Sequence, residues 1–189
     1  MTMIKLGPRA MLWPLPVVIV GVQLKGRINY LTVSYCGMIG DRPPVIAVGI
    51  GSQALTWQWI ESCTGFSVNI PSRRMAVQTD YIGMASGRDV DKSQLFDTFY
   101  GSLGDVPMIR DCPVSMECRL SGIHRLGDML ACCGEIVETF VDEAYLVGDD
   151  LDIWKADPML LIPPRPEYVG LGEVIGPAFE MGKELQGEE

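Results

Sequence analysis

Apolar residues along this chain gather into short runs, and short apolar runs bounded by turn residues predict buried β-strands. The runs lie at residues 17–23, 28–35, 45–50, 66–70 and 130–140. The first two flank the polar residues 25–27, an arrangement typical of a β-hairpin. At 114–120 apolar and polar residues alternate, which is the period of a half-buried strand. The pattern predicts a protein built mainly of strands.

Two segments have helical spacing. Apolar side chains recur every three or four residues within 54–63, and this predicts a helix that Gly65 ends. Ser72 is a suitable N-cap for a second helix running towards Gly83. The polar stretch 86–92 indicates a loop. Because strands outnumber helices, we expect a closed or partly closed β-barrel covered by a few helices.

The composition limits the class of protein. A chain of 189 residues with 48% apolar residues predicts a single globular domain over 1–189. Its net charge of −9 disfavours nucleic acid or an anionic membrane surface as a partner. The apolar run 11–22 is interrupted by Pro14 and Pro16, so it predicts neither a membrane-spanning helix nor a signal peptide. We therefore expect a cytoplasmic protein.

Metal and thiol chemistry find little support in the sequence. The six cysteines have neither a C-x-x-C pair nor zinc-ligand spacing, which indicates free thiols in a reducing compartment. Cys132 and Cys133 are adjacent and would point to opposite faces of a strand. His124 is the one histidine, so a two-histidine metal site is excluded, and a structural or surface role is expected. The sequence thus predicts no metal site.

A glycine motif precedes the first expected helix. The stretch from Gly49 to Ala54 matches G-x-G-x-x-A, the dinucleotide-binding fingerprint. The strand at 66–70 ends without the ribose-binding acid, and no series of βαβ units follows, so a Rossmann fold is disfavoured. Free amides at a helix start, with the Ser52 and Thr56 hydroxyls beside them, would still suit a phosphate.

Several polar and aromatic residues are open to more than one interpretation. Lys92, taken alone, is typical of a solvated surface lysine. Asn29 and Thr32 interrupt an apolar strand, and a bound heteroaromatic ligand would satisfy their hydrogen bonds, although Asn29 could equally be a turn residue. Trp57 and Trp59 more often pack in a core or interface than form a cofactor platform.

Taken in order, the motifs resemble the FMN-binding, flavin reductase-like split β-barrel family, and most closely its flavoredoxin branch. The matching pieces are Pro14-x-Pro16, Asn29-x-x-Thr32, Arg42-Pro43-Pro44, Phe66-Ser67-Val68-Asn69-Ile70-Pro71, Asp80-Tyr81-Ile82-Gly83, Ser86-Gly87-x-x-Val90-Asp91-Lys92, Gly134-Glu135-Ile136 and Tyr168-Val169-Gly170-Leu171-Gly172. Each piece alone has little specificity, and their common order carries the resemblance. It implies a split β-barrel of Greek-key type.

The resemblance also implies one non-covalent FMN per subunit, bound at a homodimer interface. The residues that it assigns to the ring and its polar edge are Asn29, Thr32, Val33, Ser34, Tyr35 and Cys36. It assigns Ser52, Gln53 and Thr56 to the phosphate, with Lys92 as the counter-charge. No residue is assigned a catalytic role.

Three ring-side positions depart from the family pattern. Tyr35 replaces a more usual tryptophan, Met129 replaces a histidine, and Leu161 replaces an aromatic residue. We favour an electron carrier whose donor and acceptor are redox proteins. An NAD(P)H-dependent flavin reductase is the alternative, and the missing histidine at Met129 counts against it. A third possibility is a binding module that has kept the barrel and lost the flavin.

Overall fold

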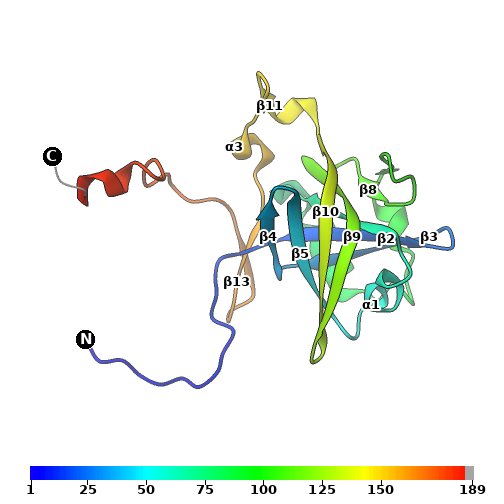
Figure 1. Cartoon of the computed structure of the whole chain (residues 1–189), viewed down its shortest axis with the longest axis horizontal. Helices are drawn as coiled ribbons and strands as arrows, with labels where there is room; N and C mark the ends of the chain where they lie inside the picture. The colour runs from blue at the N-terminus through cyan, green and yellow to red at the C-terminus, as the bar shows by residue number, and fades with distance from the viewer. Residues whose placement is uncertain (186–189) are drawn as a thin grey trace.

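The computed structural model describes residues 1–185, and its centre is one curved antiparallel sheet (Figure 1). The strands of this sheet are β2 (Val18–Leu24), β3 (Arg27–Val33), β4 (Cys36–Asp41), β5 (Pro44–Gly51), β6 (Gly65–Ile70), β9 (Val114–Leu126) and β10 (Met129–Val141). Their order is β3-β2-β6-β9-β10-β5-β4. The expected mainly-β fold is confirmed, and a parallel Rossmann sheet is excluded.

Short elements surround this barrel. The minor strands are β1 (Leu15–Pro16), β7 (Thr98–Phe99), β8 (Met108–Ile109), β11 (Leu146–Val147), β12 (Asp150–Leu151), β13 (Leu160–Ile162) and β14 (Glu167–Val169). The helices are α1 (Leu55–Ile60), α2 (Ala76–Met84) and α3 (Ile153–Ala156), with 3₁₀ turns η1 (Arg73–Met75), η2 (Lys92–Leu95), η3 (Glu143–Tyr145) and η4 (Met181–Leu185). Strands β1, β13 and β14 form a separate sheet beside β4 (Figure 1).

The β2–β3 hairpin forms as expected, and the turn explains it. Lys25 and Gly26 both have positive φ, the conformation of the tight turns whose twist matches antiparallel strands. Alternate side chains of β2 then enter different cores. Val20 and Val22 pack inside the barrel, whereas Ile19 packs outside it, in a second cluster with Tyr30 of β3 and with α2. Strand β2 is therefore buried on both faces.

Both expected helices exist, with corrected ends. Helix α1 stops at Ile60, because the amides of residues 62 and 63 bond three residues back and tighten the last turn. The second helix starts as the 3₁₀ turn η1 before it becomes α2. Ser72 occupies the expected N-cap position of this turn, but its side chain makes no capping hydrogen bond. Instead Ser72 bridges to Pro158, and the Arg73 amide donates to the Asp157 carbonyl, so a tertiary contact fixes this helix end.

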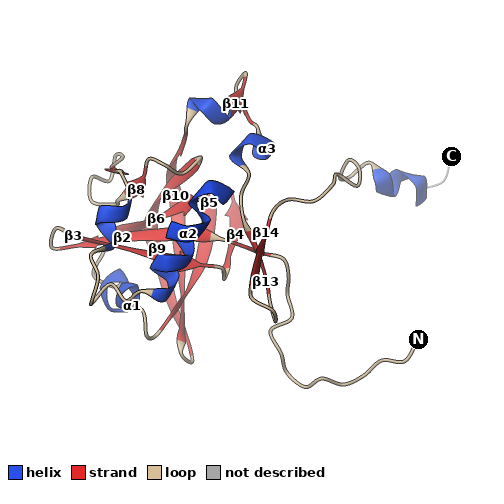
Figure 2. Cartoon of the chain, turned by 180° about the vertical axis from the view of Figure 1, so that it is seen from behind, coloured by secondary structure: helices blue, strands red, loops and turns tan. Residues whose placement is uncertain are grey.

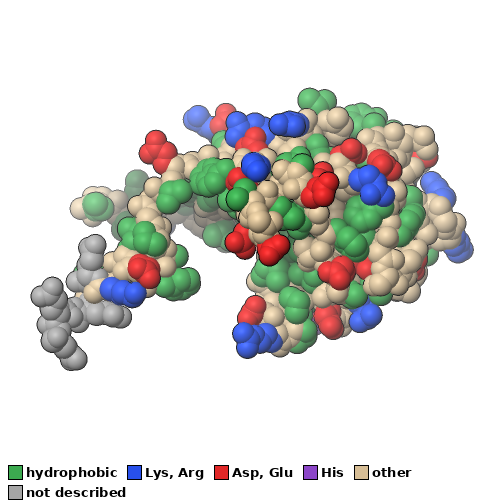
Figure 3. All heavy atoms as spheres, turned by 90° about the horizontal axis from the view of Figure 1, so that it is seen from above, with side chains coloured by type: hydrophobic (Ala, Val, Ile, Leu, Met, Phe, Trp, Pro, Cys, Tyr) green, Lys and Arg blue, Asp and Glu red, His purple; other side chains and the backbone are tan. Residues whose placement is uncertain are grey.

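Two terminal arms, residues 1–14 and 170–185, extend away from the barrel on the side of β4 and β13 (Figures 1 and 2). Their apolar side chains are exposed, including Trp13, Ile175 and Phe179. In the view from above, the C-terminal arm stands clear of the barrel and carries apolar side chains (Figure 3). Among residues 1–185, no helix combines the length and apolar character needed to cross a bilayer.

Candidate functional site

The first cavity opens where β3 ends beside the turn that joins β5 to α1, and its volume is about 480 Å³. The end of β3 and the residues after it provide one wall, and the β5–α1 turn provides another. Leu15 of β1 and Leu161 of β13 line it from the neighbouring small sheet. Of the residues assigned above to a cofactor, those that line this cavity are Thr32, Val33, Ser34, Tyr35, Ser52, Gln53 and Leu161.

Gly49 allows the side chains at this cavity to approach one another. Its amide donates to the Tyr35 carbonyl at 2.7 Å. A Cβ on Gly49 would lie 2.9 Å from Tyr35 Cβ and 3.3 Å from Met129 Cε, closer than ordinary packing permits. Tyr35 lines the cavity and is half exposed. Tyr35 and Met129, two of the three residues that depart from the family pattern, thus both lie beside Gly49.

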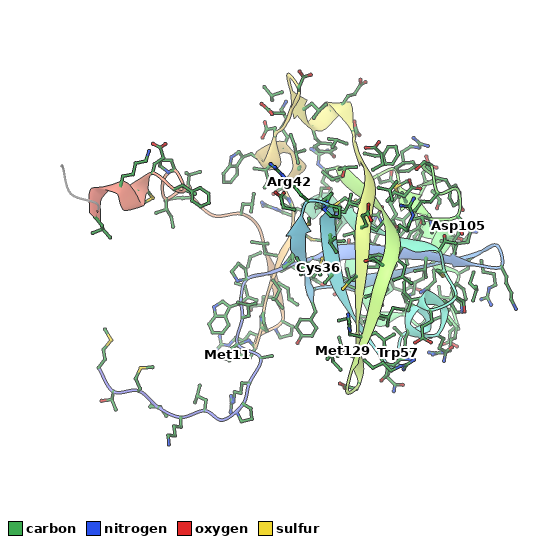
Figure 4. All side chains as sticks on the ribbon, viewed as in Figure 1. Met11, Cys36, Arg42, Trp57, Asp105 and Met129 are labelled. Atoms are coloured by element: carbon green, nitrogen blue, oxygen red, sulfur yellow. The ribbon has the colours of Figure 1, made fainter. Side chains whose placement is uncertain are left out.

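An apolar groove of about 460 Å³ adjoins the first cavity and shares Tyr35 and Gly49 with it. Cys36 and Met129 line this groove but do not line the first cavity. Figure 4 shows Cys36 on β4 and Met129 at the start of β10. Burial raises the pKa of Cys36 to about 11, so its thiol is neutral at physiological pH. A neutral thiol is a poor nucleophile.

A second, smaller cavity of about 300 Å³ adjoins the first, and the two share the lining residues Leu31, Gln53 and Ala54. Lys92 lines it and is 1% exposed, so the interpretation as a solvated surface lysine was wrong. Its Nζ donates to the Tyr30 carbonyl at 3.0 Å and to the Ile82 carbonyl at 2.6 Å. Burial lowers its pKa to about 8. An ammonium group has three donors, so one remains for a ligand.

Asn29 lines the second cavity together with Lys92, and it does not line the first cavity. Its Nδ2 donates to Thr56 Oγ1 at 2.8 Å, and both residues are buried. Its Oδ1 lies so close to Gly87 that any Cβ there would collide with it. Thr56 lies beneath the cavity surface, where its hydroxyl supports Asn29. The geometry places Asn29 at the second cavity, with Lys92, and not at the first.

The helix start offers fewer free amides than the sequence suggested. The Ser52 amide donates to the Asp128 carbonyl at 2.9 Å, and the Ala54 amide donates to the Gly51 carbonyl at 3.0 Å. These bonds close the turn between β5 and α1 and hold it against the β9–β10 hairpin. Ser52 and Gln53 line the cavity, but two of the expected free amides are occupied.

Sequence reasoning missed several lining residues. Leu15, Leu31 and Pro163 are apolar and carry no chemical signal, so only the fold reveals them. Arg88 and Ser86 line the second cavity, and both belong to the polar loop that was singled out for Lys92. Arg88 Nη1 donates to the Gln53 carbonyl at 2.9 Å and so bridges the loop to the β5–α1 turn. Because Arg88 lies in the same polar loop as Lys92, the sequence offered a signal for this second cation.

The remaining titratable groups give no competing site. Within residues 1–185, no cluster of three or more histidine, cysteine or carboxylate side chains could hold a metal ion. All six cysteines are free. His124 lies exposed on β9, in the surface position expected for it.

Comparison with known proteins gives the site its context. Flavoredoxin from Methanosarcina acetivorans is 35% identical, with a TM-score of 0.94 over 98% of this chain and 100% of that one. Flavoredoxin of Desulfovibrio vulgaris (Miyazaki F) is 32% identical, with a TM-score of 0.86 over 96% of this chain and 100% of that one. A high molecular weight rubredoxin from Moorella thermoacetica is 24% identical over 84% of this chain, which spans 65% of that protein.

The family model described as flavin reductase like domain matches residues 11–153. This range includes every lining residue of the second cavity, and every lining residue of the first except Leu161 and Pro163. The resemblance seen in the sequence motifs is therefore confirmed, and the cofactor that the fold serves is a flavin. This chain belongs to the flavin reductase-like domain family.

Proposed function

We propose that this protein is an electron carrier of flavoredoxin type that binds one FMN non-covalently in each subunit. The pair of adjoining cavities carries the proposal. The larger first cavity, with Tyr35 at its wall, would accommodate a planar ring. The smaller second cavity, with the Lys92 ammonium group, would accommodate a phosphate. Bound flavin supplies the redox chemistry, and the protein contributes binding, orientation and electrostatics.

The residues present fit this cofactor. Tyr35 and Leu161 would contact the ring, while polar backbone groups of residues 32–35 would meet its polar edge. Lys92 would direct its free N–H at the phosphate, because the Tyr30 and Ile82 carbonyls fix the other two. A preorganised cation of this kind loses little side-chain entropy on binding.

We propose a homodimer, as the resemblance implies. The terminal arms support it, because Trp13 is 46% exposed, Ile175 is 91% exposed and Phe179 is 97% exposed. Large apolar side chains left in water on extended arms are typical of an association surface. Both arms leave the barrel on the side where the first cavity meets the small sheet (Figure 1), so a second copy held between them would help to cover the ring.

A protein partner is favoured over NAD(P)H as the source of electrons. The apolar groove beside Tyr35 and Met129 is where a nicotinamide ring would have to stack, and its lining residues, within 12–131, include no lysine or arginine for nucleotide phosphates. The net charge of −9 would favour a donor with a basic patch. An NAD(P)H-dependent flavin reductase remains the alternative. The free thiols fit a reducing compartment such as the cytoplasm.

The visible spectrum of the purified protein, before and after addition of FMN, tests the proposal. We expect a bound-flavin spectrum, a stoichiometry of one per subunit and a rise in melting temperature, because a ligand that binds only the native state stabilises it. Stopped-flow reduction should be slow with NADH and fast with a low-potential redox protein. A colourless protein whose melting temperature ignores FMN would support the flavin-free binding module instead.

A further inference from the structure

The apolar groove beside the first cavity is open to solvent in the single subunit. Its lining residues, all within 12–131, carry no charge, and three of them, Tyr35, Ile39 and Leu126, are exposed. Its volume of about 460 Å³ is larger than one aromatic side chain. Because a contiguous apolar surface left in water marks a site of association, we expect another apolar group to cover this groove.

The C-terminal arm begins on the helical side of the barrel and leads away from its own groove. The Tyr168 hydroxyl donates to Asp80 Oδ1 of α2 at 2.9 Å, and Gly170 lies against the Arg73 guanidinium. From this point the arm stands clear of the barrel (Figures 1 and 3). The nine residues from Gly170 to Phe179 can span at most about 30 Å, which is enough to reach the surface of a neighbouring subunit.

A turn near the end of the arm presents Phe179. The Met181 amide donates to the Pro177 carbonyl at 3.3 Å and closes this turn. Phe179 has a φ of 64°, in the left-handed region that bulky residues rarely adopt, and among residues 1–185 nothing covers its side chain. A sparsely populated backbone conformation of this kind points to a function for the residue that adopts it.

We propose that Phe179 of the partner subunit occupies the apolar groove, so that the arm of each subunit completes the flavin site of the other. The inference rests on the homodimer and the flavin site of the proposed function. Both arms leave the barrel on the side of β4, and β4 carries the groove residues Cys36 and Ile39 (Figures 1 and 4). In a twofold dimer this contact occurs twice, with one arm in each groove.

The position of the groove gives this contact a chemical consequence. The groove and the first cavity share Tyr35 and Gly49, so an aromatic side chain in the groove would lie beside the flavin ring. Hydride transfer from a nicotinamide requires the reacting atoms to approach within about 3–3.5 Å. The partner's Phe179 would occupy the space that the nicotinamide needs. The arm would thus make the bound flavin selective for protein donors over NAD(P)H.

Disulfide trapping tests the contact without any flavin. Catalysed oxidation of the full-length Phe179→Cys variant should give a covalent dimer on a non-reducing gel, because Cys36 is the cysteine that lines the groove. Cys36→Ser in the same variant should abolish this dimer. Val77→Cys is the matched control, because Val77 is exposed on α2, and it should give no Cys36-dependent dimer.

Stopped-flow reduction of the FMN-loaded protein tests the consequence. Phe179→Ala should speed flavin reduction by NADH by about tenfold or more, because the groove becomes open to a stacked nicotinamide. Phe179→Trp keeps an aromatic ring in the groove and should remain as slow as the wild type.

The outcomes separate this inference from the proposed function. A monomer, or a dimer without the Cys36-dependent cross-link between chains, would overturn the arm contact while FMN binding still stands. A cross-linked dimer in which Phe179→Ala leaves the NADH rate unchanged would overturn the selectivity. A protein that forms the cross-link but binds no FMN would reject the proposed function and retain the contact.

Discussion

Replacement of Lys92 by methionine isolates the energetic consequence of a buried amine. The side chain is 1% exposed, and burial lowers its pKa from 10.5 to about 8. Methionine keeps most of the side-chain volume and removes the titration. Two buried carbonyls, those of Tyr30 and Ile82, would lose their donor, so the variant also acquires a constant destabilisation that does not depend on pH.

The pH dependence of stability follows from the difference between the pKa of Lys92 in the unfolded chain, 10.5, and its pKa in the native protein, about 8. Below pH 8 the amine is protonated in both the native and the unfolded states, and burial of its charge costs native stability. Between pH 8 and 10.5 the unfolded chain binds a proton that the native protein does not, so native stability rises with pH. The full difference in pKa corresponds to roughly 3.4 kcal/mol. Because Lys92 lines the second cavity rather than a closed core, we expect screening to reduce this to about 2 kcal/mol.

Urea unfolding of the wild type and of Lys92→Met, at intervals from about pH 7 to 10, measures this effect. The quantity of interest is the difference between the two free energies of unfolding, because the buried thiols with raised pKa values, such as Cys36 and Cys132, affect both proteins equally. The difference should move by about 2 kcal/mol in favour of the wild type as pH rises. A difference that stays constant across this range would refute the buried, titrating amine.

Four further predictions follow from the site and the arms. FMN affinity should fall by about ten- to a hundredfold as pH rises past the Lys92 pKa, while riboflavin affinity changes little in the same calorimetric titrations; parallel losses would place the phosphate elsewhere. Met129→His should speed flavin reduction by NADH in stopped-flow measurements, and unchanged rate and flavin affinity would mean that residue 129 does not adjoin the ring. Gly49→Ala should cost about 1–3 kcal/mol of stability in urea unfolding, because the added Cβ meets Tyr35, and a neutral effect would contradict that contact. Removal of residues 171–189 should shift the proposed dimer towards monomer in light scattering, whereas an unchanged dimer would show that this arm is dispensable.

Local signals predicted the strands and one turn well. The tight turn at Lys25 and Gly26 depends on backbone conformations that a short polar sequence can specify, so the β2–β3 hairpin was predictable. The missing capping hydrogen bond at Ser72 could not be predicted, because Ser72 pairs with Pro158, a residue distant in the chain. Sequence patterns describe neighbours along the chain, and a contact made in the folded state can override them.

The sequence predicted which residues line the candidate site better than it predicted where each of them lies. Most of the residues assigned to the cofactor line the first cavity or its neighbours. The burial of Lys92 was missed because its flanking residues are polar, and nothing local reveals that two carbonyls from separate elements meet its amine. Asn29 lines the second cavity with Lys92 because its strand packs against the loop that carries Gly87, a contact between segments that are distant in the chain.

The double burial of β2 has a consequence for how the cofactor enters and leaves. Ile19, Val20 and Val22 are fully buried in two cores, so this strand can separate from β3 only when both cores open together. Such an opening approaches global unfolding, and its amides should exchange with solvent water among the slowest in the protein. The walls built on β3 thus stay closed on the timescale of ligand exchange. We therefore expect cofactor release to depend on local motion of the walls outside β3, namely the 52–54 turn, the 86–91 loop and the small sheet, and to be insensitive to the stability of the barrel.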